Sequence, residues 1–124
     1  MIAGVGTDII EVERVAASIA KGGGFRELVF TQSEIDYCET KAHKAQHYAA
    51  RFAAKEAFFK AVGTGWAEGT AFNEIEITNG PSGKPSLRLL GATQKKLDSL
   101  EIQHIWVSLS HVKTMATAVV IIEK

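Results

Sequence analysis

The sequence YAARFAAKEAFFKAVGTG, residues 48–65, decides the fold, because it predicts a long helix against which the rest of a short chain must pack. Helical spacing starts near Lys44 and continues to Val62. Gly63 and Gly65 follow, and glycine supplies the left-handed conformation that commonly ends a helix. We therefore expect one long central helix from Lys44 to Val62.

Two charged residues of this helix, Glu56 and Lys60, lie where apolar residues are expected. At 100° per residue, Glu56 falls near Phe52 and Phe59, with alanines just beyond. The spacing of four residues suits a surface ion pair that contributes about 0.3–0.5 kcal/mol. A carboxylate on a half-buried face must instead be paired, protonated or bound to a cation. The helix alone leaves both interpretations open.

A second candidate carboxylate, Asp8, lies near the end of a predicted glycine-rich strand. Residues 2–9 alternate strictly, which predicts a strand with Gly4, Gly6 and Asp8 on one face. Asp8 has two interpretations, and in the first it only caps the helix that follows. The glycines, however, mark the close approach of a backbone or a ligand. In the second interpretation Asp8 and Glu56 together hold Mg²⁺, which prefers carboxylate, phosphate and water oxygens.

The remaining pattern predicts an α+β domain. Thr31 and Glu34 have the spacing of a capping box, and alternating segments on both sides of NGPSGKP are typical of a β-hairpin. A strand, three helices, a hairpin, a helix and a second hairpin should give a mostly antiparallel sheet packed against the long helix and shorter helices, with the strand of Asp8 at its edge. The expected segments are 2–9, 11–21, 25–30, 33–42, 44–62, 71–78, 86–90, 91–100, 104–110 and 114–124.

Composition excludes several classes of protein. At 124 residues the chain fits a single domain, residues 1–124, because each of two halves would bury too little apolar surface. No apolar run approaches the roughly 20 residues of a membrane span, and fourteen basic residues balance fourteen acidic ones, unlike in a nucleic-acid-binding protein. The lone Cys38 excludes an internal disulfide, and the first ten residues are typical of a strand, without the basic region and cleavage site expected of a leader peptide. We expect a cytoplasmic protein that binds neither nucleic acid nor membrane.

Other motifs are weaker. GVGTDI lacks the third glycine of a dinucleotide-binding loop, and no segment matches a Walker A loop. Ser110 and His111 are adjacent on a predicted strand and therefore point to opposite faces, which argues against a nucleophile–base pair. His43, His47 and His104 show no spacing typical of a metal site. The two carboxylates described above remain the strongest candidates.

The chain resembles the holo-[acyl-carrier-protein] synthases, the small phosphopantetheinyl transferases of bacterial fatty-acid synthesis, in GVGTDIIEVERV, FRELVFTQSEI, YAARFAAKEAFFKAVGTG, NGPSGKP and SLSH. Its most specific segments are the G-x-D strand end and the F-x-x-K-E-A-x-x-K-A helix. The resemblance covers nearly the whole chain and implies the phosphopantetheinyl transferase fold. It also implies Mg²⁺-dependent transfer of 4'-phosphopantetheine from coenzyme A to a serine of apo acyl carrier protein, with release of adenosine 3',5'-bisphosphate. A homotrimer with active sites between neighbouring subunits is a further implication.

By position, the resemblance implies a catalytic metal and phosphate site at Asp8, Glu56 and Lys60. Asp8 and Glu56 would hold Mg²⁺ against the pyrophosphate of coenzyme A, and Lys60, one turn later, would meet a phosphate oxygen. The transfer also requires an acceptor for the serine proton. Glu56, a metal-bound water or hydroxide, and His111 all stay open as that acceptor.

The resemblance places further residues around coenzyme A. They belong to the long helix, its glycine end, the G-K-P turn and the S-x-S-H segment. Gly80 replaces the family's acidic residue, and Phe59 stands where a smaller residue is common, which changes details of nucleotide contact. The residues expected to bind coenzyme A are Arg51, Lys55, Lys60, Gly63, Gly65, Gly83, Lys84, Pro85, Ser110 and His111, with Ser108 near the phosphates.

Acyl carrier proteins are acidic, so a chain without net charge needs a local basic face to meet one. Arg14, Lys21 and Arg26, in and after the first helix, are candidates, although an ordinary solvated helix face is an equal alternative. Two rival functions stay open. One is a coenzyme A-dependent acyltransferase that needs no metal, and the other is a non-catalytic module that binds coenzyme A or acyl carrier protein.

Overall fold

The computed structural model describes residues 1–63 and 69–124. Its elements follow the predicted order, and the long helix has the predicted bounds. The predicted strand over residues 71–78 begins too early. Phe72–Glu74 form a short 3₁₀ turn, η1, and the strand itself is Ile75–Asn79. The elements are β1 (Ile2–Glu11), α1 (Val12–Ala20), α2 (Phe25–Val29), α3 (Gln32–Glu39), α4 (Lys44–Val62), η1 (Phe72–Glu74), β2 (Ile75–Asn79), β3 (Pro85–Leu89), α5 (Gly91–Leu97), η2 (Asp98–Leu100), β4 (His104–His111) and β5 (Met115–Glu123).

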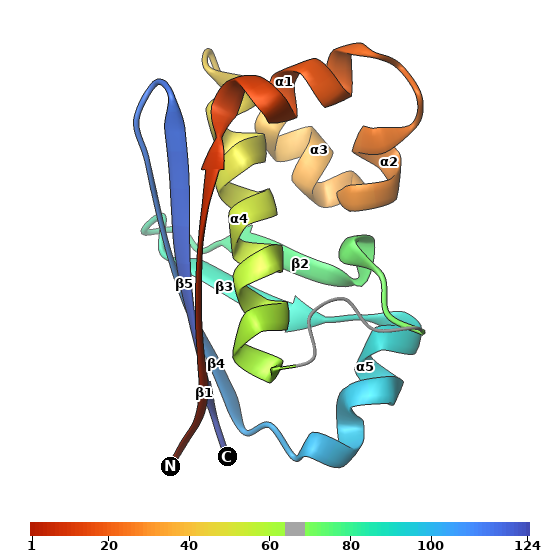
Figure 1. Cartoon of the computed structure of the whole chain (residues 1–124), viewed down its shortest axis with the longest axis vertical. Coiled ribbons are helices and arrows are strands. Elements are labelled where there is room, and N and C mark those ends of the chain that lie inside the picture. Colours follow the sequence, from red (N-terminus) through yellow and green to blue (C-terminus); the bar gives the residue numbers. More distant parts are fainter. Residues whose placement is uncertain (64–68) are drawn as a thin grey trace.

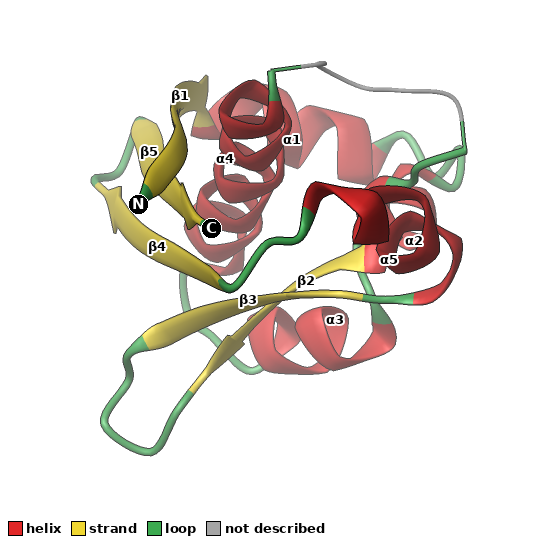
Figure 2. Cartoon of the chain, turned by 90° about the horizontal axis from the view of Figure 1, so that it is seen from below, coloured by secondary structure: helices red, strands yellow, loops and turns green. Residues whose placement is uncertain are grey.

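The strands form two antiparallel sheets on different sides of α4. Strands β1, β5 and β4 lie in that order in one sheet, so β1 and β4 are its edges, and β2 pairs with β3 in a separate hairpin. Figures 1 and 2 show the three-stranded sheet along one side of α4 and the β2–β3 hairpin crossing beside the helix, with β3 next to β4. The α+β fold with antiparallel strands and an edge strand bearing Asp8 is confirmed. The division into two sheets was not predicted.

Two glycines bring β1 into direct contact with the backbone of α4. A Cβ atom at Gly4 would lie 2.0 Å from the carbonyl oxygen of Ala61, and one at Gly6 would lie 2.0 Å from that of Ala57. No side chain fits at these distances, so the strand and helix can approach this closely only with glycine at both positions. The glycine strip therefore marks a backbone approach, and it brings Asp8, on the same face, against α4.

Helix α4 is enclosed, which explains its many alanines. It contacts β1, β5 and β4 on one side and α1, α3 and β2 on others. Ala49, Ala53 and Ala57 have no exposed surface, and Phe58 fills the space toward Ile75 within the same core cluster. Small side chains let several elements approach one helix closely. Among the described residues, no helix is both long and apolar enough to cross a bilayer.

Of the two helix caps considered in the sequence, the one at Thr31 is present and the one at Asp8 is not. Thr31 and Glu34 form the predicted capping box, with hydrogen bonds of 2.9 and 3.2 Å. Asp8, in contrast, does not cap α1, because Glu11 is the N-cap and no side chain bonds to the helix start. The capping interpretation of Asp8 is wrong, since its side chain faces α4 instead. Cys38 is fully buried and free, as predicted.

Candidate active site

Asp8, Glu56 and Lys60 meet between β1 and α4, and we call them the acidic cluster. The ammonium of Lys60 donates to Oδ1 of Asp8 at 2.8 Å. Oδ2 of Asp8 is buried and has no hydrogen-bond partner. A buried carboxylate oxygen without a partner is costly, so the cluster is incomplete as a purely structural ion pair.

The electrostatics of the acidic cluster favour an additional cation. Burial raises the pKa of Glu56 above its usual range, and the Asp8 carboxylate raises it further while Lys60 opposes the shift. The hydrogen bond to Asp8 raises the pKa of Lys60, which therefore stays charged. Two carboxylates share one ammonium here, and the repulsion between them would fall if a divalent cation joined them.

The donor atoms of the acidic cluster fit Mg²⁺. The described residues contain no group of three or more histidine, cysteine or acidic side chains suited to a metal. Two carboxylates are nevertheless sufficient for Mg²⁺ where substrate phosphates and water complete the octahedron. The unpartnered Oδ2 of Asp8 beside Glu56 is such a partial site.

A second cluster, which we call the arginine pocket, lies between α4, β4 and the β2–β3 hairpin. It is a cavity of about 200 Å³. The guanidinium of Arg51 stacks 4.2 Å from the ring centre of Tyr37 and donates to Oδ1 of Asn79. Its buried Nε has no hydrogen-bond partner. Asn79 in turn donates to the carbonyl of Gly83 at 2.9 Å, which ties the hairpin loop to the arginine. The residues that line the cavity are Tyr37, His47, Ala50, Arg51, Asn79, Gly83, Pro85, Ser108, Leu109 and His111.

Two histidines complete the arginine pocket. His47 and His111 lie with ring centres 5.1 Å apart, and Nδ1 of His111 is 2.8 Å from Oε1 of Gln46. Burial lowers the pKa of His47, and its electrostatic interactions with His111 and Arg51 lower it further. A cavity lined by an arginine with a free donor and by histidines is suited to an anion such as a phosphate group.

The two clusters point away from each other within one chain. Lys60 follows Arg51 by nine residues, which is 2.5 helical turns, so their side chains leave opposite faces of α4. The strands agree, because Asp8 lies on edge strand β1 and His111 on the opposite edge strand β4. A single chain therefore does not assemble the predicted phosphate ligands in one cleft.

The prediction that Lys55 binds coenzyme A is wrong. Its side chain has no exposed surface, and its ammonium lies 2.7 Å from Oε1 of Glu34. Three backbone carbonyl oxygens surround the same nitrogen. Lys55 faces the interior because it leaves α4 about 100° away from Glu56, on the side covered by α3 and β2.

The other predicted coenzyme A ligands lie in different places. Gly63 ends α4 with a φ of 90°, as predicted, and Gly65 lies outside the described residues. Lys84 is exposed at the hairpin, 5.3 Å from the ring centre of Trp106. Ser110 is exposed on the opposite side of β4 from the neighbouring Leu109, which packs on the core. Of the predicted coenzyme A ligands, the structure brings together those that line the arginine pocket, namely Arg51, Gly83, Pro85 and His111.

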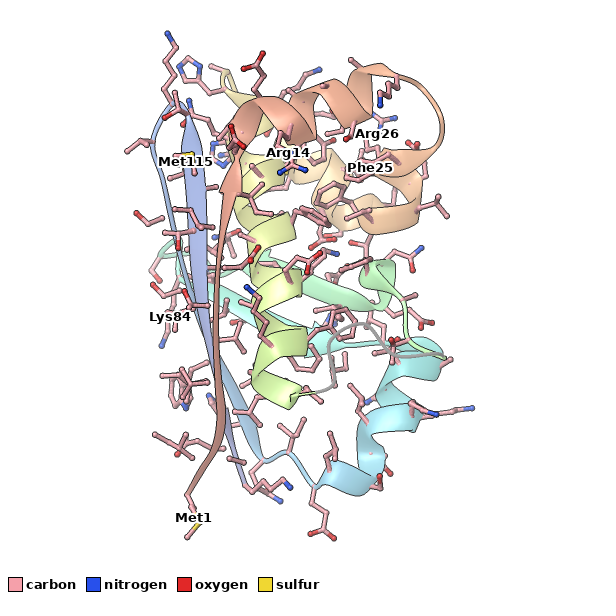
Figure 3. The ribbon with its side chains drawn as sticks, viewed as in Figure 1. Met1, Arg14, Phe25, Arg26, Lys84 and Met115 are labelled. Carbon is pink, nitrogen blue, oxygen red and sulfur yellow. The ribbon has the colours of Figure 1, made fainter. Side chains whose placement is uncertain are left out.

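The predicted carrier-binding residues lie at one end of the molecule. Arg14 lines a groove of about 380 Å³ together with Phe25, Phe52 and Met115, and Figure 3 shows Arg14, Phe25 and Met115 at this end, far from Lys84. Lys21 follows α1 and is exposed. The Arg26 guanidinium forms ion pairs with Glu27 at 2.7 Å and Glu39 at 3.4 Å, so part of its charge is already neutralised.

Three residues of the arginine pocket were missed at the sequence level. Tyr37, His47 and Asn79 all line it, and only Asn79 belongs to a segment singled out above, as the first residue of NGPSGKP, where no role was predicted for it. His47 precedes Arg51 by four residues, which places both on one helix face and was the only usable signal. Tyr37 reaches the pocket from α3, and no local pattern predicts that contact.

Comparison with known proteins gives a consistent result. The family model described as the 4'-phosphopantetheinyl transferase superfamily matches residues 4–120. A holo-[acyl-carrier-protein] synthase of Ruminiclostridium cellulolyticum is 53% identical over 120 residues, which are 95% of this chain and 90% of the relative. The crystal structure of the holo-[acyl-carrier-protein] synthase of Neisseria meningitidis has a TM-score of 0.91 at 35% identity and covers 100% of both chains. That of Helicobacter pylori, in complex with coenzyme A, has a TM-score of 0.84 at 31% identity and covers 96% of this chain and 99% of the other.

Proposed function

The chain belongs to the 4'-phosphopantetheinyl transferase superfamily, and we propose that it transfers the 4'-phosphopantetheine arm of coenzyme A to a serine of apo acyl carrier protein. The serine hydroxyl attacks the β-phosphorus of coenzyme A and loses its proton. The pyrophosphate bond breaks, and adenosine 3',5'-bisphosphate leaves with the electron pair. The observation that carries this proposal is the incompletely paired acidic cluster, in a fold shared with a relative solved in complex with coenzyme A.

Asp8 and Glu56 would hold Mg²⁺ in this proposal. The ion supplies charge neutralisation to the pyrophosphate, on which negative charge builds in the transition state. Lys60, which pairs with Asp8 in the free protein and is more than half exposed, is positioned to contact a phosphate oxygen as well. Mg²⁺ and Lys60 would thereby place positive charge beside the pyrophosphate, where negative charge develops during the reaction.

Glu56 is our choice as acceptor of the serine proton. Glu56 lies at the site of the proposed ion, beside the pyrophosphate, so its carboxylate could take the proton directly or through a water bound to the ion. Within one chain His111 lies in the arginine pocket, on the other side of α4, so only the His111 of a neighbouring subunit could reach the serine.

The arginine pocket would hold phosphate and nucleotide groups of coenzyme A. Arg51 offers a buried donor without a partner, and the hairpin that carries Gly83 and Pro85 forms one wall. Because this pocket and the acidic cluster diverge in one chain, a complete site requires two chains. The arginine pocket of one subunit would face the acidic cluster of its neighbour.

A homotrimer with active sites between subunits meets this requirement. The sheet face turned away from α4 is not covered by any described element, and Val5, Ile9 and Trp106 on it are 59%, 65% and 44% exposed. Apolar side chains at this density on one face are typical of a surface that pairs with a further copy. The number of three subunits is the family's expectation.

The acyl carrier protein would dock on the groove beside Arg14. The groove contains Phe25 and Met115 for apolar contact, with Arg14, Lys21 and Arg26 as partners for an acidic helix. The groove also contains Phe52, one turn before Glu56 on α4, so a carrier bound there would bring its serine near the acidic cluster.

The product, holo acyl carrier protein, would serve fatty-acid biosynthesis in the cytoplasm.

The direct test is incubation with coenzyme A, Mg²⁺ and apo acyl carrier protein, followed by mass spectrometry of the carrier. The proposal predicts a gain of about 340 Da, the mass of the transferred arm. A coenzyme A-dependent acyltransferase would add an acyl group from an acylated coenzyme A and would be insensitive to EDTA. A non-catalytic binding module would leave the carrier mass unchanged while still binding one of the two partners.

A further inference from the structure

The pair formed by Lys55 and Glu34 is isolated from solvent. Both side chains have no exposed surface, and their nitrogen and oxygen lie 2.7 Å apart. Burial lowers the pKa of Lys55, and the Glu34 carboxylate counteracts this shift. The contacts favour the charged state, because an ammonium offers three N–H donors to the four surrounding oxygen atoms, whereas a neutral amine offers two and turns its lone pair toward an oxygen.

The oxygen atoms around Lys55 come from segments that are far apart in the sequence. Two backbone acceptors, the carbonyls of Phe72 and Ile75 at 2.8 and 2.7 Å, belong to η1 and the start of β2. A third, the carbonyl of Val29 at 2.8 Å, ends α2. Glu34 adds α3 and also accepts from the backbone N–H of Ile77 at 2.9 Å. The pair therefore fixes α4 to α2, α3 and β2 at a single point.

That point is adjacent to the acidic cluster. Lys55 precedes Glu56 directly, so the two side chains leave α4 about 100° apart. On the other side, Gly4 and Gly6 place β1 and Asp8 against the helix backbone. Helix α4 is thus held from both sides at the level of Glu56.

A small rotation of α4 would separate the carboxylates. A glutamate carboxylate lies about 6 Å from the helix axis, so a rotation of 10° displaces it by about 1 Å. A functional group has to be held within about 0.5 Å of its working position. The hydrogen bonds of Lys55 are directional and therefore oppose such a rotation.

Stability alone does not account for this arrangement. A buried ion pair gains little over apolar residues of the same size, because removing two charges from water offsets their attraction. We propose that Lys55 and Glu34 are positioning residues, which fix the rotation of α4 so that Glu56 and Asp8 bind one divalent cation together. This inference rests on the metal site of the proposed function.

The test compares Mn²⁺ affinity, measured by calorimetry without coenzyme A, in the wild type and in variants checked for folding by circular dichroism. The double variant Lys55→Met/Glu34→Gln removes both charges, leaves net charge unchanged and avoids an unpaired buried charge. We expect it to fold and to bind Mn²⁺ about tenfold more weakly, which is a typical loss when residues behind a metal site are removed. Glu34→Gln alone keeps the three carbonyl partners of Lys55 but leaves its buried ammonium without a counter-charge, and it should also weaken Mn²⁺ binding. The control Lys44→Met removes an exposed lysine of the same helix, paired with Glu39, and should bind Mn²⁺ as the wild type does.

The outcomes separate the inference from the proposed function. A wild type that binds no Mn²⁺ even after coenzyme A is added overturns the metal site itself. If the wild type binds and a folded double variant binds equally well, the positioning role is wrong. Should the double variant fail to fold, Glu34→Gln decides, since unchanged Mn²⁺ affinity in that folded variant contradicts the inference and weaker affinity supports it.

Discussion

At the residue scale, the acidic cluster derives its chemistry from incomplete pairing. Asp8 satisfies one oxygen with Lys60 and leaves the other buried without a partner, while Glu56 lies beside it at a raised pKa. Two carboxylates and one ammonium leave an excess negative charge in a half-buried site. A divalent cation would remove that excess, which explains why these residue types occur together.

Replacement of either carboxylate should abolish metal binding and most of the activity. We expect Asp8→Asn and Glu56→Gln each to lower kcat about 100-fold or more, because each removes an oxygen charge at which transition-state charge is stabilised. Mass spectrometry of the carrier over time measures the rate. Asp36→Asn, which neutralises an exposed carboxylate of α3, is the matched control and should behave as the wild type. Full activity of Glu56→Gln would remove Glu56 from the mechanism.

His47 should make the stability of the free protein depend on pH. Its pKa in the folded state is lowered from 6.5, so the folded protein binds fewer protons there than the unfolded chain. The stabilising contribution is therefore complete above pH 6.5 and is lost as the pH falls through the folded-state pKa. In melting curves recorded from about pH 7.5 to about pH 5, His47→Gln should show a smaller fall in Tm than the wild type. The exposed His43→Gln should not, and an equal effect of both variants would contradict the assignment.

The sequence predicted the residues of the acidic cluster but not the role of Lys55. Gly6, Asp8, Glu56 and Lys60 stood out because charge and glycine were unusual on predicted apolar faces. In the sequence, Lys55 and Glu56 are neighbouring charged residues of the same alanine-rich helix. Lys55 is buried because α3 and β2 pack against its side of α4. That packing follows from contacts distant in sequence, so local periodicity could not supply it.

At the scale of elements, the close contact between β1 and α4 is the critical junction. We expect Gly6→Ala to destabilise the protein by about 3 kcal/mol, because its methyl group would overlap the carbonyl of Ala57 and force strand and helix apart. Urea unfolding at fixed protein concentration measures the loss. At Gly23 an added Cβ would meet no atom within 4 Å apart from its chain neighbours. Gly23→Ala should therefore change stability by no more than about 0.5 kcal/mol. A Gly6→Ala protein as stable as Gly23→Ala would disprove the close approach.

Element boundaries were predictable wherever local chemistry sets them. Helix α4 matched at both ends because Gly63 supplies a left-handed C-terminus, and α3 matched at its start because Thr31 caps it. The strands of the two hairpins were also foreseen. Their division between two sheets was not, because the way the hairpin lies against β4 and α4 follows from contacts distant in sequence, which no strand pattern encodes.

At the scale of the whole molecule, one chain presents two half-sites. Arg51 and Lys60 leave opposite faces of α4, and the outer face of the β1–β5–β4 sheet is apolar and uncovered by the described residues. Composition and periodicity gave no indication of this, because they carry no information about a second chain. Only the family resemblance predicted sites between subunits, and the divergence of the two clusters gives that expectation a physical reason.

Subunit mixing tests this assembled site most directly. Asp8→Asn spoils only the acidic cluster and Arg51→Ala only the arginine pocket, so assemblies of either variant alone should hardly modify the carrier. In the proposed trimer, refolded from an equal mixture, roughly a quarter of the interfaces would join two intact half-sites, because each half is intact in half of the subunits. The account predicts that transfer to the carrier, followed by mass spectrometry, recovers to roughly a quarter of the wild-type rate. A mixture no more active than its two components would contradict it.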